Sequence, residues 1–505
     1  MTTNNGHRRR PNIVLVLIDT LRADRLSCYR NGARTSPCID RIAERGVLYE
    51  NAISPAAWTV PAHASIFTGT YPSRHGVDLS RLILAPELAP LPEILQRNGY
   101  RTFGVSSNYW LSRETVFDRG FDEFVHSWQL VQSAGTNQPL QRQQRKMPVG
   151  LQSANGSEKR QAGRRTIGNA LNWLHEETVK RLRQSFHAYD SGAWRVNRQV
   201  RRWARRWKDM SEPFFAFVHY MEPHIRYAAP GRYRTLHVPP SVPSARVEKL
   251  NQDPWRFLAG KARMTAEDFA ILGGLYDGEV SYVDSRVGQL YEMLQRDGLL
   301  RNTILIITSD HGENLGDHGL MSHAYCVYDT LVRVPLIVHY PGTFPAGERV
   351  GEQVQTLDLF PTLLTLAEVR DPAAWAQVQG ESLTGAARND RLVFSEYPDA
   401  EPAVSMITER YPEFDGSPYD RSLRAVRSAT HKYIQGSDGR DELYDLTRDP
   451  GEEHDVLSSH PQIAADLRGA LGRWVGSFEH APDAGESIEI DDDMRRRLED
   501  LGYLA

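Results

Sequence analysis

The stretch PNIVLVLIDT, residues 11–20, places six consecutive aliphatic residues directly before an aspartate. An apolar run without polar alternation is typical of a strand in a parallel sheet that is covered on both faces. Asp19 then stands at the carboxyl end of the strand, where sheets of this kind bind ligands. An aspartate that only caps the following turn occupies the same position, so other residues have to decide between the two roles.

Further apolar runs follow, and patterns typical of helices alternate with them. The predicted strands are residues 13–18, 102–106, 214–219, 303–308 and 335–339. The predicted helices are residues 38–44, 91–98, 266–297 and 358–367. This alternation predicts an α/β fold with a large, mainly parallel sheet between layers of helices.

Acidic and histidine residues stand at the ends of three of these predicted strands. They are Asp19, the pair His219 and His224, and the adjacent pair Asp310 and His311. The carboxyl ends of parallel strands meet at one edge of a sheet, so we expect these side chains to converge there.

Residues 130–212 depart from the alternation, and we interpret them as a basic insertion. From residue 141 to residue 209 the chain carries 17 Lys and Arg against five Asp and Glu. The second part, residues 194–209, is predicted to be an amphipathic helix. Its packing side chains are expected to be Trp194, Val200, Ala204 and Trp207. Contact of this helix with an anionic partner, a substrate arm or a second copy of the chain is the alternative.

The pattern changes again after about residue 385. Short strands of a hairpin and a helix at residues 463–478 predict a small antiparallel-sheet and helix subdomain. We therefore expect a catalytic domain over residues 11–385, which contains the basic insertion, and a C-terminal subdomain and tail over residues 386–505.

The composition is that of a globular enzyme. The 505 residues are 40% hydrophobic and 25% charged, with a net charge of −4, so nucleic acid is not an expected partner. No apolar run reaches the length of a membrane span. The three cysteines, Cys28, Cys38 and Cys326, form no regular framework, which favours a reducing cytoplasm. A homo-oligomer stays an open alternative.

Seven segments, found in the same order in the family, resemble the sulfatase family of the alkaline phosphatase superfamily. They are NIVLVLIDTLRADRLSCY, SPAAWTVPAHASIFTGTYPSRHGV, GYRTFGVSSN, FFAFVHYMEPHIRY, TILIITSDHGENLGDHGL, RVPLIVHYPG and LYDLTRDPGEEHDV. The resemblance extends from residue 12 to about residue 475 and leaves out the basic insertion. It implies an alkaline-phosphatase-like sandwich and an ester hydrolase. The implied metal ligands are Asp19, Thr59, Asp310 and His311.

Several positions differ from the sulfatase pattern. Thr59 stands where sulfatases carry the Cys or Ser that becomes formylglycine, and threonine cannot form that aldehyde because its β-carbon bears a methyl group. His63 replaces the arginine of the motif, Asn108 lies where a lysine motif is usual, and His323 replaces a second lysine. His311 replaces a common asparagine, which favours Mn²⁺ or Zn²⁺ over Ca²⁺.

A threonine nucleophile with a histidine among the metal ligands resembles two other groups of the superfamily. These are the nucleotide pyrophosphatase/phosphodiesterases and the lipoteichoic acid synthase and phosphoethanolamine transferase group. The resemblance implies that a metal-activated Thr59 attacks phosphorus or sulfur and forms a covalent intermediate. His224, at the position of the family's anion-contacting histidine, and His323 are the predicted catalytic proton donors. His63 and Asn108 are the predicted substrate contacts.

The sequence thus predicts a hydrolase of a small anionic phosphodiester, phosphonate or sulfate ester with one divalent metal ion, Mn²⁺ or Zn²⁺ rather than Ca²⁺. A second ion with His219, His224 and His323 as donors stays open. Two other functions stay open: a soluble transferase to an alcohol acceptor, and an inactive relative that binds an anion or a partner protein. The joint retention of the four metal-ligand residues favours the enzyme.

Overall fold

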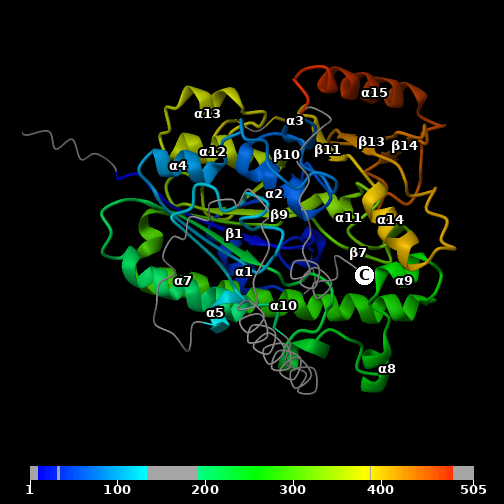
Figure 1. Cartoon of the computed structure of the whole chain (residues 1–505), viewed down its shortest axis with the longest axis horizontal. Helices are drawn as coiled ribbons and strands as arrows, with labels where there is room; N and C mark the ends of the chain where they lie inside the picture. Colours follow the sequence, from blue (N-terminus) through cyan, green and yellow to red (C-terminus); the bar gives the residue numbers. More distant parts are fainter. Residues whose placement is uncertain (1–8, 31–33, 133–189, 387, 482–505) are drawn as a thin grey trace, which may run out of the picture.

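The computed structural model describes residues 9–30, 34–132, 190–386 and 388–481. The first part of the predicted basic insertion and the tail after residue 481 lie outside these ranges. Within them the chain forms a central sheet between two layers of helices, with a second, smaller sheet beside it (Figure 1).

The central sheet has eight strands in the order β10-β2-β9-β6-β1-β5-β3-β4. Neighbouring strands are parallel except at β9, which is antiparallel to β6 and to β2. The prediction of a mainly parallel sheet is therefore confirmed. The strands are β1 (Asn12–Ile18), β2 (Val47–Ile53), β3 (Arg101–Ser106), β4 (Glu123–His126), β5 (Phe214–Tyr220), β6 (Thr303–Thr308), β9 (Arg333–His339) and β10 (Glu348–Gln355).

Three strands of this sheet were not predicted. β4 and β10 lie at its two edges, and β10 starts with exposed residues. β2 interrupts its apolar residues with a half-buried Glu50 and Asn51, where its pairing with β9 also shifts register. Their residues lack the continuous apolar run on which the prediction rested, so only pairing with neighbouring strands identifies them.

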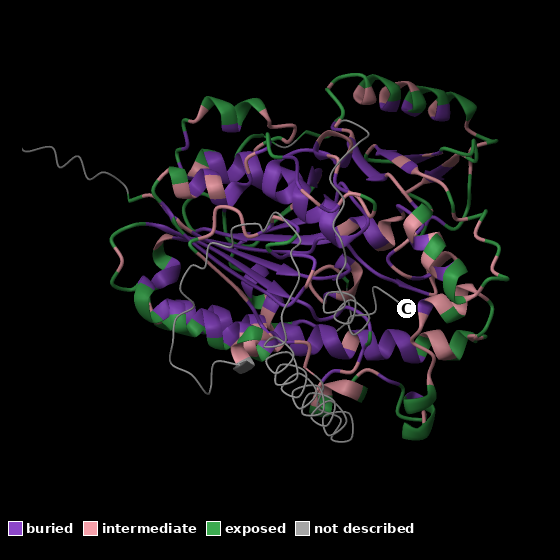
Figure 2. Ribbon diagram, viewed as in Figure 1, coloured by how far each residue is buried: buried purple, intermediate pink, exposed green. Residues whose placement is uncertain are grey.

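Helices bury both faces of the sheet, as the run in residues 13–18 predicts. Alternate residues of β1 belong to two separate apolar clusters. One cluster includes α2 (Thr59–Thr68), α4 (Leu91–Arg97) and α12 (Leu359–Leu366), and the other α1 (Pro37–Ala43), α7 (Ala193–Trp207) and α10 (Ala266–Arg296). Figure 2 shows the inner strands of the sheet and α2 as almost wholly buried.

The predicted basic helix is α7, and it packs on the sheet rather than standing apart. The ring of Trp203 is tilted against that of Phe103 with centroids 5.4 Å apart, and Trp207 stacks on Phe214 with ring centroids 4.1 Å apart. The assignment of Trp194 to the packing stripe was wrong, because this side chain is 42% exposed. The buried apolar residues are Ala193, Val196, Val200, Trp203, Ala204 and Trp207, which repeat at the spacing of one helical face.

A four-stranded antiparallel sheet and the helix that follows it form most of the C-terminal part, as predicted. The elements are β11 (Val393–Tyr397), β12 (Leu423–Arg427), β13 (His431–Gly436), β14 (Glu442–Asp445) and α15 (Pro461–Val475). This sheet touches the segment between β2 and α2, where Ala56 and Glu396 form a single β-bridge. Glu396 is buried and accepts a hydrogen bond from the amide of Ser73 at 2.8 Å. The smaller sheet thus supports the loop that leads to Thr59.

The remaining elements are short, and none of the helices in the described ranges is long and apolar enough to span a bilayer. They are η1 (Ala23–Arg25), α3 (Pro72–His75), α5 (Gln129–Gln132), η2 (Gly231–Thr235), α8 (Ser244–Lys249), α9 (Pro254–Leu258), η3 (Leu299–Asn302), β7 (Asn314–Leu315), η4 (Asp317–Gly319), β8 (Met321–Ser322), α11 (Asp329–Val332), η5 (Thr356–Asp358), α13 (Pro372–Ala376) and α14 (Glu401–Arg410).

Candidate active site

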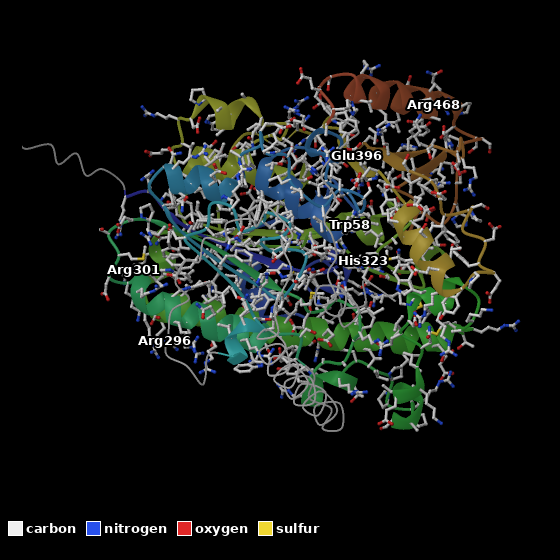
Figure 3. The ribbon with its side chains drawn as sticks, viewed as in Figure 1. Trp58, Arg296, Arg301, His323, Glu396 and Arg468 are labelled. Atoms are coloured by element: carbon white, nitrogen blue, oxygen red, sulfur yellow. The ribbon has the colours of Figure 1, made fainter. Side chains whose placement is uncertain are left out.

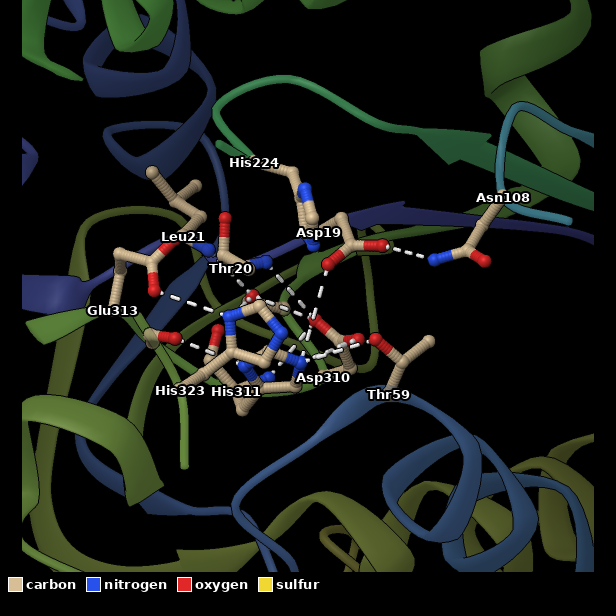
Figure 4. Close-up of polar contacts among 12 residues, drawn as sticks. Asp19, Thr20, Leu21, Thr59, Asn108, His224, Asp310, His311, Glu313 and His323 are labelled. Carbon is tan, nitrogen blue, oxygen red and sulfur yellow. Dashed lines mark hydrogen bonds and ion pairs between the residues drawn. The ribbon is translucent and has the colours of Figure 1, made fainter. Parts of the chain in front are cut away.

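Three elements bring the predicted metal ligands together. Asp19 follows β1, and Asp310 and His311 follow β6, its parallel neighbour in the sheet. Thr59 is the first residue of α2, so its hydroxyl lies at the helix N-terminus, where the helix dipole favours negative charge. Figure 4 shows these four side chains facing one another.

The distances within this group are short. One ligand atom each from Asp19, Asp310 and His311 lies within 4.8 Å of the others, and all three residues are buried. His311 Nε2 is 3.4 Å from Asp310 Oδ2 and 3.9 Å from Asp19 Oδ1. The Thr59 hydroxyl is 3.2 Å from the same His311 nitrogen.

Backbone contacts fix how His311 and Asp310 present their free atoms. His311 Nδ1–H donates to the carbonyl of Gly312 at 2.9 Å. The other ring nitrogen, Nε2, therefore carries a lone pair, and this lone pair faces Thr59. Asp310 Oδ1 accepts from the amides of Thr20 at 3.2 Å and His311 at 2.9 Å. Its other oxygen, Oδ2, and Asp19 Oδ1 are buried without a hydrogen bond in the described part of the chain.

These atoms fit a divalent cation. Burial and the neighbouring Asp19 raise the pKa of Asp310 to about 7, and burial raises the pKa of Asp19. Burial lowers the pKa of His311 to about 4, so its imidazole is neutral, as a metal ligand must be. Two buried carboxylates, each with an oxygen that has no hydrogen bond to a described residue, and a neutral imidazole nitrogen can all bind one cation. Its positive charge would stabilise the ionised form of both acids.

The two predicted substrate contacts lie against the cluster of Asp19, Thr59, Asp310 and His311, which is called the metal group below. Asn108 Nδ2 donates to Asp19 Oδ2 at 2.7 Å. His63 Nδ1–H donates to the carbonyl of Thr59 at 2.8 Å, and the same nitrogen is 3.6 Å from Asp310 Oδ2. Both side chains are fully buried. Their shown contacts orient the metal group and the turn at Thr59, and their contact with substrate stays a prediction.

Two further residues belong to the site. His219 Nε2 lies 3.3 Å from Asp19 Oδ2, in agreement with the expected convergence of these residues at the strand ends, whereas its role as a donor to a second ion stays a prediction. Glu313, which was not predicted, is buried and accepts a hydrogen bond from His323 Nδ1 at 3.1 Å. Its position three residues after Asp310, in SDHGEN, is the signal that could have indicated it.

The two predicted proton donors lie beside the metal group on separate loops. The ring of His323 is 4.6 Å from that of His311 and 5.0 Å from that of His224, measured between centroids. His224 Nδ1–H donates to the carbonyl of Ile225 at 2.8 Å. Burial lowers the pKa of His224 to about 4 and that of His323 to about 3. Both rings are therefore neutral at pH 7 until a substrate anion lies next to them.

Two buried glutamates support the loop that carries His224. Glu279 of α10 accepts the amide hydrogen of Ala228 at 2.7 Å, and Glu222 accepts that of Ala193 at 3.3 Å. Burial raises the pKa of Glu279 to about 8 and raises that of Glu222 well above its usual value. The loop is therefore held by carboxyl groups that keep their protons near neutral pH.

Replacing Glu279 by glutamine is expected to change the pH dependence of stability. The pKa of Glu279 rises from about 4.3 in the unfolded chain to about 8, so stability falls as pH rises through this window. Urea unfolding should show Glu279→Gln near wild-type stability at pH 5, and about 2–4 kcal/mol more stable at pH 8. Glu292→Gln, on the exposed face of the same helix, is the control. A difference that does not vary with pH would contradict the assignment.

The sheet between two helix layers, with an acid and histidine group at the carboxyl ends of β1 and β6, agrees with the alkaline-phosphatase-like fold that the resemblance implies. Comparison with known proteins is more specific. The chain matches the family described as Sulfatase over residues 11–369, and N-sulphoglucosamine sulphohydrolase, C-terminal, over residues 316–473. It therefore belongs to the sulfatase family and is a hydrolase that acts on ester bonds.

Similar proteins come from distant organisms. The chain is 25% identical to the uncharacterised sulfatase YidJ of Escherichia coli, over 96% of each chain. It is 25% identical to iduronate 2-sulfatase of Mus musculus, over 72% of this chain and 69% of the relative. The phosphonate monoester hydrolase of Silicibacter pomeroyi shares the fold, with a TM-score of 0.66 at 20% identity over 96% of this chain and 98% of that chain.

Proposed function

We propose that the protein hydrolyses a monoanionic ester of phosphorus or sulfur, with Thr59 as the nucleophile and one divalent cation held by Asp19, Thr59, Asp310 and His311. The observation that carries this proposal is the 3.2 Å contact between the Thr59 hydroxyl and His311 Nε2, within the buried acid and histidine group. Phosphodiesters, phosphonate esters and sulfate esters all belong to this substrate class.

The surroundings of Thr59 support its role as nucleophile. Its hydroxyl lies at the N-terminus of the ten-residue helix α2, where an alkoxide is stabilised by the dipole. His63 holds the Thr59 carbonyl, and His311 accepts from its hydroxyl, so the side chain has a fixed direction. A divalent cation bound here lowers the pKa of the hydroxyl and offsets negative charge on the transferred group.

The reaction has two balanced steps. In the first, the Thr59 oxygen, having lost its proton, bonds to phosphorus or sulfur while the bond to the leaving oxygen breaks. That oxygen takes a proton from His224 or His323, which lie beside the metal group. The Thr59 proton goes to solvent in this step. In the second step, water gives one proton to the same histidine and its oxygen bonds to phosphorus or sulfur, while the bond to the Thr59 oxygen breaks. That oxygen takes a proton back from solvent, so the hydroxyl is restored and the product anion leaves.

The charge of the residues around the metal group favours a substrate group with one negative charge. His63, Asn108 and His323 stand where sulfatases usually carry arginine or lysine. Fewer fixed cations suit a phosphodiester, a phosphonate monoester or a sulfate ester better than a dianionic phosphate monoester. We favour the phosphorus esters, because a threonine cannot supply the formylglycine chemistry of sulfate-ester relatives. We favour Mn²⁺ or Zn²⁺ as the metal, because the imidazole of His311 is a nitrogen ligand.

Transfer to an alcohol instead of water is the second outcome that the same covalent Thr59 ester permits. No described residue distinguishes the two, so an added alcohol acceptor belongs in the assay. The proposal also includes a cytoplasmic location, supported by Cys28, Cys38 and Cys326, which are all free thiols.

A panel of nitrophenyl esters tests the proposed substrate class. It contains a phosphodiester, a phosphonate ester, a phosphate monoester and a sulfate ester, each assayed with Mn²⁺, Zn²⁺ or Ca²⁺. We expect turnover of at least one monoanionic ester with Mn²⁺ or Zn²⁺, and faster turnover than that of the phosphate monoester. Preferred hydrolysis of the dianionic monoester, or no turnover with any metal, would contradict the proposal.

A further inference from the structure

A region outside the metal group is strongly basic. It is a groove of about 890 Å³ formed by the chain around α8 and α9 and by the end of α14. Figure 1 shows these three helices close together on one side of the molecule. Its charged lining consists of Arg226, Lys249, Arg256, Lys261, Arg263 and Arg410 against Glu248 and Asp253.

Part of this charge is used within the protein. Arg410 pairs with Asp253 at 2.9 Å, and Asp253 also accepts from the amide of Arg256 at the start of α9. Lys261 pairs with Glu413. These contacts hold α9 and α14 together and neutralise Asp253.

Three other cations of the groove have no such partner. Arg226, Lys249 and Arg263 are exposed, and none of them makes a side-chain hydrogen bond or an ion pair with another described residue. The groove therefore presents positive charge that the described chain does not balance, and a bound anion would supply the missing partner.

The groove adjoins both histidine loops of the site. Arg226 lies two residues after His224. The next residue, Tyr227, donates its amide hydrogen to Gln252 Oε1 at 2.8 Å, and Gln252 Nε2 donates to the Tyr227 carbonyl at 3.3 Å. Gln252 lines the groove, and α9 packs against β8, directly before His323.

The two predicted proton donors are the least buried of the predicted catalytic residues. Asp19 and Thr59 are 0% exposed, whereas His224 is 3% and His323 8% exposed. His224 is also two residues from Arg226 in the chain, so the groove begins next to the more accessible side of the site.

We propose that the groove is a subsite for the non-reacting part of the substrate, and that this part carries at least one further sulfate or phosphate group bound by Arg226, Lys249 and Arg263. The proposal rests on the proposed ester hydrolysis, because it takes both anionic groups to belong to one substrate. Guanidinium groups pair with such oxyanions through two parallel hydrogen bonds, so the subsite adds affinity and orientation.

Binding of polyanions that cannot occupy Thr59 productively tests the subsite directly. The probes are sucrose octasulfate and inositol hexakisphosphate, which separate sulfate from phosphate groups, with calorimetry as the readout. We expect Arg226→Ala/Lys249→Ala/Arg263→Ala to weaken binding about tenfold, since each exposed pair contributes modestly. Arg296→Ala/Arg301→Ala, in a part of the molecule far from His323 in Figure 3, should leave binding unchanged.

Kinetics link the subsite to catalysis. The same polyanions should inhibit hydrolysis of a nitrophenyl ester competitively, and the triple variant should raise their inhibition constants about tenfold. Its kcat and KM for the small ester itself should stay within about twofold, because that ester does not reach the groove. Raising salt from about 50 mM to about 500 mM should weaken inhibition of the wild type far more than of the variant.

The two measurements separate the possible failures. If no ester is hydrolysed but the triple variant loses polyanion binding, the proposed hydrolysis fails and the anion site stands. If the wild type binds neither polyanion at low salt, or if the triple variant binds both as tightly as the wild type, the subsite is overturned. Equal losses in the triple variant and the Arg296/Arg301 control would show only a general charge effect and would also overturn it.

Discussion

Replacing Thr59 by alanine is expected to lower kcat for the active nitrophenyl ester on the order of 10⁴-fold or more. The reason is that the variant lacks the Thr59 hydroxyl, which lies 3.2 Å from His311 Nε2 in the wild type. Without it, no covalent ester forms, and attack has to come from water that the site does not hold in place. Steady-state kinetics on the metal-loaded protein, with intact-mass analysis of quenched reactions, measures both consequences.

Matched variants separate chemistry from structure at this position. Thr59→Ser keeps a hydroxyl at the helix N-terminus and should retain activity within about tenfold of the wild type. Thr68→Ala removes another buried hydroxyl from the far end of the same helix and should leave kcat within a small factor. Both variants and Thr59→Ala should unfold at similar temperatures.

One result would remove Thr59 from its assigned role. If Thr59→Ala keeps full activity, or if a quenched wild-type reaction carries its covalent adduct on another residue, the nucleophile lies elsewhere. Equal losses in Thr59→Ala and Thr59→Ser with an unchanged melting temperature would also contradict a role for the hydroxyl.

Removal of metal is expected to have the second largest effect. A chelator should abolish activity and lower the melting temperature, because Asp19 and Asp310 then lose the cation that stabilises their buried charges. An ion present at about 100 times its dissociation constant stabilises the fold by about 2.7 kcal/mol. Mn²⁺ or Zn²⁺ should restore both properties, and Ca²⁺ alone should not, because one ligand is an imidazole.

Changes to single ligands test the metal group residue by residue. Asp310→Asn removes the negative charge of a carboxylate whose Oδ2 has no hydrogen bond to a described residue. This change should weaken metal binding about 100-fold or more. Asp284→Asn is the control, since this buried carboxylate accepts from the amides of Cys38 and Ile39 and lies outside the metal group. His311→Asn, which offers an oxygen ligand instead of nitrogen, should shift preference toward Ca²⁺.

Analysis of the bound metal can contradict the proposed metal site in two ways. If the purified protein contains calcium alone and is fully active, the preference argued from His311 is wrong. If Asp310→Asn binds Mn²⁺ as tightly as the wild type does, Asp310 is not a ligand, and the metal group has to be rebuilt from other donors.

Four site positions could be predicted from short stretches of sequence. Asp19 and the pair Asp310–His311 follow continuous apolar runs, and Thr59 was predicted because its loop resembles the sulfatase motif. The expected convergence of His219 with Asp19 is also seen, but that expectation did not specify which atoms meet. Glu313 was missed although it stands three residues after Asp310, because its contact with His323 forms only when the segments after β6 and β8 come together.

The same distinction holds for the fold. The run in residues 13–18 predicted a strand buried on both faces, because apolar side chains on alternate positions each need a covering layer. The existence of β2, β4 and β10 was not predictable in this way, since their residues mix polar and apolar types. Such segments form strands only where a neighbouring strand is placed to make backbone hydrogen bonds with them. The apolar run of β9 predicted a strand but not its direction, because an apolar run is the same for either direction.

The sequence by itself therefore determined the α/β layers, the sulfatase-family membership and the presence of a threonine at position 59, because each depends on short contiguous stretches of residues. Only the tertiary structure decided that Thr59, Asp310 and His311 lie within contact distance, that Trp194 faces solvent, and that Arg226, Lys249 and Arg263 share one groove. Those facts depend on which distant segments become neighbours, and neighbours are chosen by packing of the whole sheet and its helices.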